Sequence, residues 1–467
     1  MTETPAADVY RTMDLALRIG ELMLAAGAGA ADVSAQMNNV GRVLGLRSFT
    51  ADVTFTELTM TYQPPDDAPA LIQIRQVRTR LADYDVLTAV DLLVRDLVAG
   101  RIGRDDAAEA IKTLTSSPHR RAPWKLTVSL GVMGVGVALM LDSPWQVLLI
   151  AFAAACFIDI IQRQLARRRA PVFYQQAAGG LFATLMAAGV TYALDDIGPS
   201  RVITSSIFIL LAGVSFLGAV QDALTGFPLT AGARFLEAVM ATVGVLGGVS
   251  GGLTLASVFG IGLGDIDPGS IILAPWPWTV AGGAIAAAAY AFSARAPIRS
   301  LLPGALIAAA GTGVYLAVFG VGIDVAWSSA VGAGVIGVVS FAVAGRCRVP
   351  PLLIVTAAIV PLLPGLSAYR ALALFSQGSD GALFALANAA AITIALGAGV
   401  IGGQYLAQPL KREARRLENK LAGPRLVGPL TVRYERLRAR DHRIRRMARR
   451  GSSGEVSSGG GDEAASR

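Results

Sequence analysis

Charged residues, cysteine and histidine are all scarce in this 467-residue chain. Only 16% of its residues are charged, against roughly 25% in soluble domains, which excludes a water-soluble fold for much of the chain. The two cysteines, Cys156 and Cys347, are too far apart in sequence to suggest a disulfide framework or a metal-ligand motif. The two histidines, His119 and His442, lie in polar flanks. We therefore expect neither a metal nor a cofactor.

The sequence also lacks a secretion signal and the residue patterns of an enzyme. No charged segment followed by an apolar stretch and a cleavage site opens the chain, so we expect no signal peptide. Residues 1–123 contain no cysteine, a single histidine, and neither a GxSxG motif nor metal-ligand spacing. A membrane-anchored hydrolase in this region is therefore a weak alternative, and we expect no enzymatic activity. A regulatory or gating domain fits these residues better.

The residues that are present fall into three blocks of different charge. Residues 1–123 carry 16 acidic and 13 basic residues, an ordinary balance for a soluble domain. From Trp124 to about Tyr405, apolar runs recur with the length of about 20 residues that a membrane-spanning helix needs. Residues 411–450 then hold 15 basic and four acidic residues, a net charge of +11 that exceeds the +8 of the whole chain. The high isoelectric point thus describes a tail, and we expect no nucleic-acid partner.

The first block, residues 1–123, predicts a small α/β domain. Apolar residues at helical spacing predict two helices in residues 8–46. Alternation of apolar and polar residues predicts one half-buried strand over 47–62, and residues 71–77 read as a second strand. Residues 83–114 then predict two helices separated at Gly100.

Ten apolar spans follow, and the charges in their connecting loops predict their orientation. Loops on one side carry nine basic residues, whereas the opposite loops carry two basic and seven acidic residues. Loops rich in Lys and Arg stay in the cytoplasm, so both termini are expected inside. The expected spans are 124–141, 145–161, 174–194, 202–220, 235–262, 276–293, 301–320, 325–345, 351–369 and 383–406.

Two of these spans contain similar interruptions. The stretch "LLAGVSFLGAVQDALTG" (210–226) aligns without a gap with "LLPGLSAYRALALFSQG" (362–378), 152 residues later, and matches it at six of 17 positions. The stretches belong to the fourth and ninth spans, which cross the membrane in opposite directions because five spans separate them. We therefore predict two inverted five-helix repeats, residues 124–263 and 276–407, an arrangement found in many secondary transporters.

A helix interrupted inside a membrane frees backbone N–H and C=O groups that protein or cavity water must satisfy. The same groups suit a small zwitterion, because amides can bind its carboxylate and carbonyls its ammonium group. Hydroxyl residues near the breaks could line such a cavity, although Ser and Thr also bond back to helix carbonyls routinely. The candidates are Thr204, Gly213 and Ser215 in the first repeat, and Thr356, Pro364, Gly365 and Ser367 in the second.

Charged residues beside the spans are the other candidates, because an acid at the bilayer centre costs about 2.5–3.5 kcal/mol and usually marks a pathway. Asp222 ends the fourth span, and Arg370 follows the second break. Glu237 lies one helical turn after Arg234, so these two can pair. We interpret Asp159, with Arg163 four residues later, as an ion pair at a helix end. The Gly244, Gly248 and Gly252 stripe reads as a packing surface.

Four segments resemble the bacterial threonine/serine exporter family over residues of about 8–407. They are "GELMLAAGAGAADVSAQMNNVGRVLGL" (20–46), "AVDLLVRDLVAGRIGRDDAAEAI" (89–111), "GAVQDALTGFPLTAGARFLEA" (218–238) and "PLLPGLSAYRAL" (361–372). The resemblance implies a cytoplasmic N-terminal domain, ten membrane helices in the bacterial cytoplasmic membrane, and proton-driven export of threonine and serine. Asp222, Gly226, Arg234 and Glu237 match the central block of the family, and Pro364 and Gly365 match its second-half break.

One residue departs from that family pattern, since Ala212-Gly213 stands where the family has Pro-Gly in the first half. The first break is therefore expected to be softer, and the substrate could differ. Asp222 or Glu237 is the candidate acid that couples export to proton entry. The alternative cargo is a small dicarboxylate, for which Arg234 and Arg370 would be the ligands.

The C-terminal block is expected to act at the membrane surface. Residues 408–450 form a basic tail that anionic lipid headgroups would attract by about 1 kcal/mol per basic residue. Residues 451–467 are rich in Gly and Ser and are expected to be disordered. A homo-oligomer is compatible with the sequence, and the other expected partners are the amino acid, protons and the lipid bilayer.

Overall fold

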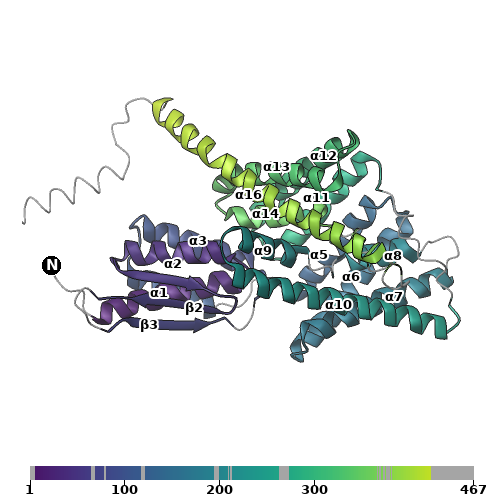
Figure 1. Ribbon diagram of the computed structural model, residues 1–467, viewed down its shortest axis with the longest axis horizontal. Helices are drawn as coiled ribbons and strands as arrows, with labels where there is room; N and C mark the ends of the chain where they lie inside the picture. Colours follow the sequence, from purple (N-terminus) through teal and green to yellow (C-terminus); the bar gives the residue numbers. More distant parts are fainter. Residues whose placement is uncertain are drawn as a thin grey trace, which may run out of the picture. The chain divides into compact units, whose positions relative to one another are not determined.

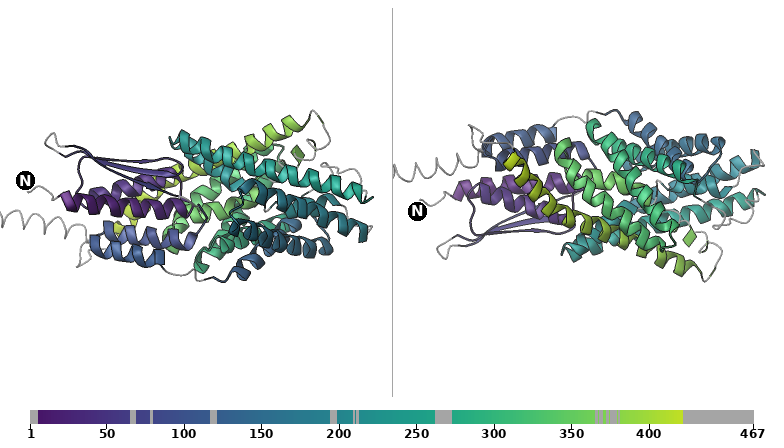
Figure 2. Two further views of the ribbon diagram at one scale, coloured as in Figure 1. Left: turned by 90° about the horizontal axis from the view of Figure 1, so that it is seen from below. Right: turned by 90° about the horizontal axis from the view of Figure 1, so that it is seen from above.

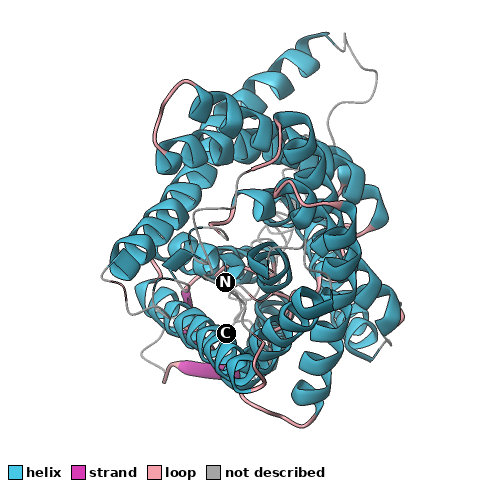
Figure 3. Ribbon diagram, turned by 90° about the vertical axis from the view of Figure 1, so that its right-hand side faces the viewer, coloured by secondary structure: helices cyan, strands magenta, loops and turns pink. Residues whose placement is uncertain are grey.

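Helices make up most of the described part of this computed structural model (Figure 3). The structure describes residues 6–64, 69–77, 80–116, 121–193, 199–208, 210, 213–261, 273–364, 367, 370–371, 374, 379 and 381–421. Contacts divide the chain into two units, residues 1–408 and 409–467. Of the second unit, only the C-terminal part of helix α16 (Gly381–Leu421) is described. The basic tail and the glycine-rich end therefore lie almost wholly outside the described residues.

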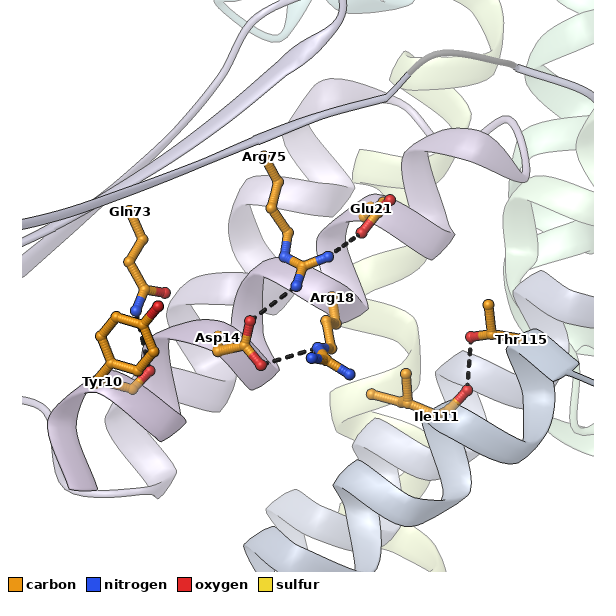
Figure 4. Close-up of polar contacts among 8 residues, drawn as sticks. All are labelled: Tyr10, Asp14, Arg18, Glu21, Gln73, Arg75, Ile111 and Thr115. Carbon is orange, nitrogen blue, oxygen red and sulfur yellow. Dashed lines mark hydrogen bonds and ion pairs between the residues drawn. The ribbon is translucent and has the colours of Figure 1, made fainter. Parts of the chain in front are cut away.

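The N-terminal residues fold as four helices and a three-stranded antiparallel sheet. Figure 1 labels five of these elements, α1, α2, α3, β2 and β3. Helix α1 packs on β2 and β3, and α2 packs on β1. Figure 4 shows Arg75 of β3 between two acids of α1, with Arg75 Nη2–Asp14 Oδ1 at 2.8 Å and Arg75 Nη1–Glu21 Oε2 at 2.6 Å. The elements are α1 (Ala6–Ala25), α2 (Ala30–Val43), β1 (Phe49–Val53), β2 (Glu57–Tyr62), β3 (Leu71–Gln76), α3 (Tyr84–Val98) and α4 (Arg104–Ser116).

The prediction of a single strand over residues 47–62 is wrong. That segment is a hairpin, in which Val53 of β1 pairs with Leu58 of β2. The Thr54 amide donates to the Glu57 carbonyl oxygen at 2.8 Å and closes the turn. The turn contains neither Gly nor Pro, so the usual turn signal is missing. The one trace of the turn is that the apolar positions change from odd numbers, up to Phe55, to even numbers, from Leu58.

The helices that follow match the predicted spans in position. Six of them are long and apolar enough to cross a membrane: α5, α6, α10, η1 with α12, α13, and residues 381–408 of α16. The chain is therefore a multi-pass membrane protein, and ten crossings stay a prediction. The remaining bounds are α5 (Pro123–Met140), α6 (Trp145–Arg167), α7 (Val172–Ala193), α8 (Pro199–Ile207), α9 (Gly213–Leu224), α10 (Pro228–Val258), α11 (Trp276–Ser293), η1 (Ile298–Ser300), α12 (Leu301–Gly320), α13 (Val325–Cys347), α14 (Pro351–Ile359) and η2 (Val360–Leu362).

Both quoted spans are interrupted. In the first, α8 ends at Ile207 and α9 begins at Gly213. In the second, α14 ends at Ile359, a short 3-10 turn follows, and Leu363 is extended with φ −57° and ψ 142°. The breaks therefore fall where the sequence places Ala212-Gly213 and Pro364-Gly365. Ala212 and Gly365 themselves lie outside the described residues.

Glycines allow two pairs of long helices to pack with their backbones in contact. A Cβ on Gly248 of α10 would lie 2.0 Å from the Ala177 carbonyl oxygen of α7. A Cβ on Gly399 of α16 would likewise lie 2.2 Å from the Ala330 carbonyl oxygen of α13. The packing interpretation of the glycine stripe in α10 is confirmed.

The helix starts repeat along the chain at a constant interval. Helices α5, α6, α7, α8 and α10 begin at residues 123, 145, 172, 199 and 228. Elements α11, η1, α13, α14 and α16 begin at residues 276, 298, 325, 351 and 381, each 152 or 153 residues later. This is the spacing of the two similar stretches in the sequence.

Candidate functional site

A cavity of about 90 Å³ lies beside the two helix breaks. Six of its described lining residues carry a hydroxyl group: Thr204 of α8, Thr279 of α11, Thr312 and Tyr315 of α12, Ser329 of α13, and Ser367. Helices from both halves of the membrane part therefore contribute. Among the lining residues that the structure describes, none is charged. The others are Val137, Met140, Leu141, Phe208, Leu273, Val325, Pro361, Leu362, Leu363, Pro364 and Ile392.

Backbone groups at the breaks add to this polar lining. Some end carbonyls are already engaged, since Phe208 N donates to Thr204 O at 3.1 Å, Leu210 N to Ile207 O at 2.8 Å and Leu363 N to Val360 O at 3.2 Å. The other end carbonyls of α8 and α14 and the first amides of α9 have no partner within their own helix. A helix C-terminus favours a cation and an N-terminus favours an anion. A Cβ on Gly213, at the start of α9, would lie 3.1 Å from Leu363, so the two breaks lie against each other. The cavity of about 90 Å³ beside the breaks, called the central cavity below, can thus bind a small zwitterion without a charged side chain.

A second, larger cavity of about 790 Å³ borders the same breaks and includes Gly213 and Pro364 in its lining. It lies between α9, α10 and α16 and is apolar apart from Thr242 and Thr393. Both of these hydroxyls donate at 2.8 Å to carbonyls of their own helices. This cavity is unsuited to a zwitterion.

Asp222 lies at the contact between the membrane helices and the N-terminal fold. Its side chain is buried, with 1% exposure, and Oδ2 is 2.8 Å from Nη1 of Arg234. Oδ1 accepts a hydrogen bond of 3.0 Å from the Ala30 amide, at the start of α2. Arg234 also donates to the Ala28 carbonyl oxygen at 3.2 Å. The ion pair between α9 and α10 therefore binds the α1–α2 turn through the Ala30 amide and the Ala28 carbonyl oxygen.

Arg234 pairs with Asp222 and not with Glu237, the partner that the spacing of one helical turn allowed. Glu237 is exposed on α10. It still acts electrostatically on Arg80, whose guanidinium lies over the Phe55 ring. Burial, and then the charge of Arg234, lower the pKa of Arg80 to about 10, while Asp222 and Glu237 oppose that shift. Arg80 thus joins the same cluster from the N-terminal side.

The other predicted residues fall into three groups: some line the central cavity, some are exposed, and one is buried away from the cavity. Thr204, Pro364 and Ser367 line the central cavity. Ser215 and Arg370 are exposed, so the cavity lining that the structure describes includes neither. Thr356 is buried and donates to Leu352 O at 2.7 Å.

A second contact between the N-terminal fold and the membrane helices lies at α11 and α14, the helix of Thr356. Tyr84 of α3 is buried in the same packed cluster as Tyr290 of α11 and the buried residues of α14. The Tyr84 amide donates to the Ala294 carbonyl oxygen at 2.9 Å. Figure 2 shows the purple and blue N-terminal elements gathered at one end of the membrane helices. The N-terminal fold therefore touches both halves, through Asp222 and Arg234 on one side and α11 and α14 on the other.

Sequence reasoning missed Thr279, Thr312, Tyr315 and Ser329. These residues lie in ordinary uninterrupted spans, where a single hydroxyl is unremarkable. Only Thr312 carried a signal in the sequence, because it lies at the centre of an otherwise apolar span of 20 residues.

Comparison with known proteins identifies the family. A family model for threonine/serine exporters matches residues 14–256, more than half of the chain. The chain belongs to the threonine/serine exporter family. A second model, "Threonine/Serine exporter, ThrE", matches residues 279–404. The two matched regions together include both helix breaks.

Curated relatives extend over most of this exporter-family chain. The "Probable threonine/serine exporter" of Mycobacterium tuberculosis is 32% identical over 429 residues, 89% of this chain and 80% of that protein. The "Threonine/serine exporter" of Corynebacterium glutamicum is 32% identical over 426 residues, 88% of this chain and 86% of that protein. The "Probable succinate transporter subunit YjjP" of Escherichia coli is 24% identical over 245 residues, 52% of this chain and 93% of that protein. No solved structure matches.

Proposed function

We propose that this protein exports threonine and serine across the bacterial cytoplasmic membrane, driven by proton entry. The observation that carries the proposal is the uncharged, hydroxyl-lined cavity at two adjacent helix breaks. Its volume of about 90 Å³ could hold about six to nine waters, since one needs roughly 10–15 Å³ by this measure. That is the size class of a small amino acid.

Two observations support an inverted repeat as the transport scaffold. The first is the interval of 152 or 153 residues between corresponding helix starts. The second is the contact between α5 and α11, the first helix of each half. Ser129 Oγ donates to Ala289 O at 2.7 Å, and a Cβ on Gly136 would lie 2.7 Å from Gly282 O.

Later residues of α5 therefore meet earlier residues of α11, so these two corresponding helices run antiparallel. Adding 153 to Ser129 and Gly136 gives positions 282 and 289, which are the contacted residues in exchanged order. That relation is expected of a two-fold axis in the membrane plane. Alternating access would then come from one repeat rocking against the other around the cavity.

Asp222 is the proposed coupling acid. Asp222 lies nine residues after Gly213 in α9, which is about 14 Å along the helix axis at 1.5 Å per residue. It therefore acts at the cytoplasmic contact and not on the bound amino acid. Protonation would cancel its charge, weaken its bond to Arg234 and loosen the α1–α2 turn. The N-terminal fold would thereby respond to the proton, which makes it the cytoplasmic gate. Both termini are proposed to lie inside.

Efflux from proteoliposomes tests the proposal. Preloaded labelled threonine should leave faster when a proton gradient is imposed, and Asp222→Asn should lose most of that acceleration, about tenfold or more. Asp159→Asn is the matched control, because Asp159 is also buried and pairs with Arg163 at 2.8 Å on α6. It should keep the gradient response. Wild-type protein that is folded but moves neither threonine nor serine would contradict the proposal.

Export of a dicarboxylate is the alternative that the succinate-transporter relative raises. Its expected cationic ligands are engaged or exposed, since Arg234 pairs with Asp222 and Arg370 is exposed. Adding succinate as a competitor in the same assay separates the two cargoes. Competition by serine and not by succinate is the expected result.

A further inference from the structure

One buried threonine differs from the other buried threonines of the described membrane helices. Threonines in membrane helices normally donate to a carbonyl one turn earlier. Thr184 does so to Gly180 O at 3.0 Å, Thr356 to Leu352 O at 2.7 Å, and Thr393 to Ala389 O at 2.8 Å. Thr312 Oγ1 has no hydrogen-bond partner in the described part of the chain. Thr312 as a whole is buried, with 1% exposure.

The position of Thr312 explains what that hydroxyl could meet. Thr312 lines the central cavity from α12, near Pro361 and the second break. Gly283 of α11 packs closely beside it without a side chain, because a Cβ there would lie 3.2 Å from Thr312 Oγ1 and 3.1 Å from Pro361 Cβ. An unpartnered buried hydroxyl is costly, so the site is more stable when a polar group enters.

We infer that the Thr312 hydroxyl recognises the side-chain hydroxyl of the transported amino acid. This rests on the proposed function, since it assigns one group within the proposed binding cavity. A hydroxyl both donates and accepts, and it therefore complements another neutral hydroxyl. The helix ends at the breaks remain for the carboxylate and ammonium groups. The class of substrate selected is a small amino acid with a β-hydroxyl.

The consequence is selectivity against amino acids of the same size that lack the hydroxyl. A site built to bond a hydroxyl rejects such analogues strongly, because its own polar group then stays unpaired. Removing that polar group should abolish the rejection and leave the cavity shape unchanged. Thr312→Val does this, since a methyl group replaces the hydroxyl.

The test compares efflux of threonine with that of 2-aminobutyrate, which is threonine with a hydrogen in place of the β-hydroxyl, in the full-length reconstituted protein. The wild-type preference for threonine should fall about tenfold or more in Thr312→Val, with 2-aminobutyrate still transported. Thr312→Ser should restore the preference. The matched control is Ser340→Ala on α13, whose Oγ is also buried and unpartnered but outside the described cavity lining.

Each outcome decides between the two claims. An unchanged preference in Thr312→Val, with threonine transport intact, would overturn the inference and leave the exporter standing, with cavity water as the partner of Thr312. Equal loss of both substrates, unrestored by Thr312→Ser, would also overturn it. Wild-type protein that moves neither threonine nor serine would overturn the proposed function itself. A thermal midpoint lowered only in Thr312→Val, and not in Ser340→Ala, would mark a structural role and contradict the inference.

Discussion

Asp83 has two roles at the start of α3. Its Oδ1 accepts a hydrogen bond of 3.2 Å from the Val86 amide and caps the helix. Its Oδ2 is 2.7 Å from Nη1 of Arg295, a residue just beyond α11 with a φ of 60°. Asn caps helices as well as Asp does, so a single substitution can separate the cap from the ion pair.

We expect Asp83→Asn to keep the cap and lose the ion pair, which stabilises the docked N-terminal fold by about 1–3 kcal/mol. The thermal midpoint in detergent should fall by a few degrees. Asp85→Asn is the control, since Asp85 lies in the same first turn but is exposed. It should change the midpoint by less. Equal effects from the two variants would assign the loss to the helix dipole and not to docking.

At the scale of elements, the contact between α7 and α10 depends on glycine at defined positions. Gly248 faces the backbone of α7, whereas a Cβ on Gly247, the preceding residue, would meet nothing within 4 Å. Van der Waals contact drives association of membrane helices, so close backbone approach is what the glycine stripe provides.

Gly248→Ala should therefore push α10 away from α7 and destabilise the protein by about 1–3 kcal/mol. Gly247→Ala should be neutral or slightly stabilising, because alanine is the better helix former. Thermal unfolding followed by intrinsic fluorescence compares the two. A Gly247→Ala midpoint as low as that of Gly248→Ala would contradict the packing.

At the scale of the whole molecule, the inverted repeat predicts that corresponding loops lie on opposite sides of the membrane. The loop after α5 contains Asp142, and the short 3-10 turn η1 that follows α11 and opens the next span contains Arg299; both residues are exposed. The positive-inside rule places the arginine loop in the cytoplasm.

Single cysteines at these positions test that orientation, once Cys156 and Cys347 have been replaced by serine. Asp142→Cys in intact cells should react with a membrane-impermeant maleimide. Arg299→Cys should react only after permeabilisation. Labelling of both positions from outside would exclude the inverted arrangement.

At the same scale, the N-terminal fold is in contact with both halves of the membrane part. In the first half, Asp222 and Arg234 contact the backbone of Ala30 and Ala28 in the N-terminal fold. In the second half, Ala294 and Arg295 contact Tyr84 and Asp83 of the N-terminal fold. If the halves rock against each other, one set of contacts must change. Under the proposed coupling of a proton to Asp222, one of those contacts, the N-terminal fold would take a direct part in transport.

Much of the architecture could be predicted from the sequence because it depends on properties local to a segment. Apolar length predicted the spans, and Pro or Gly within them predicted where α8 and α14 would end. The Asp159–Arg163 pair, one turn apart, was predicted for the same reason and is confirmed at 2.8 Å. The hairpin at Thr54 was missed because its turn carries neither Gly nor Pro.

The candidate site was predicted only in part, because partners distant in sequence are chosen by packing. The sequence by itself determined the membrane-spanning character, the two breaks and their interval, since composition and helix breakers act locally whatever surrounds them. Only the tertiary structure decided that Arg234 pairs with Asp222 and not with Glu237, and that Ser215 faces away from the cavity that Ser367 lines. It also decided that Thr312 lacks the usual carbonyl partner. These outcomes depend on which helix faces lie against one another, and that is fixed by the summed packing of the whole chain.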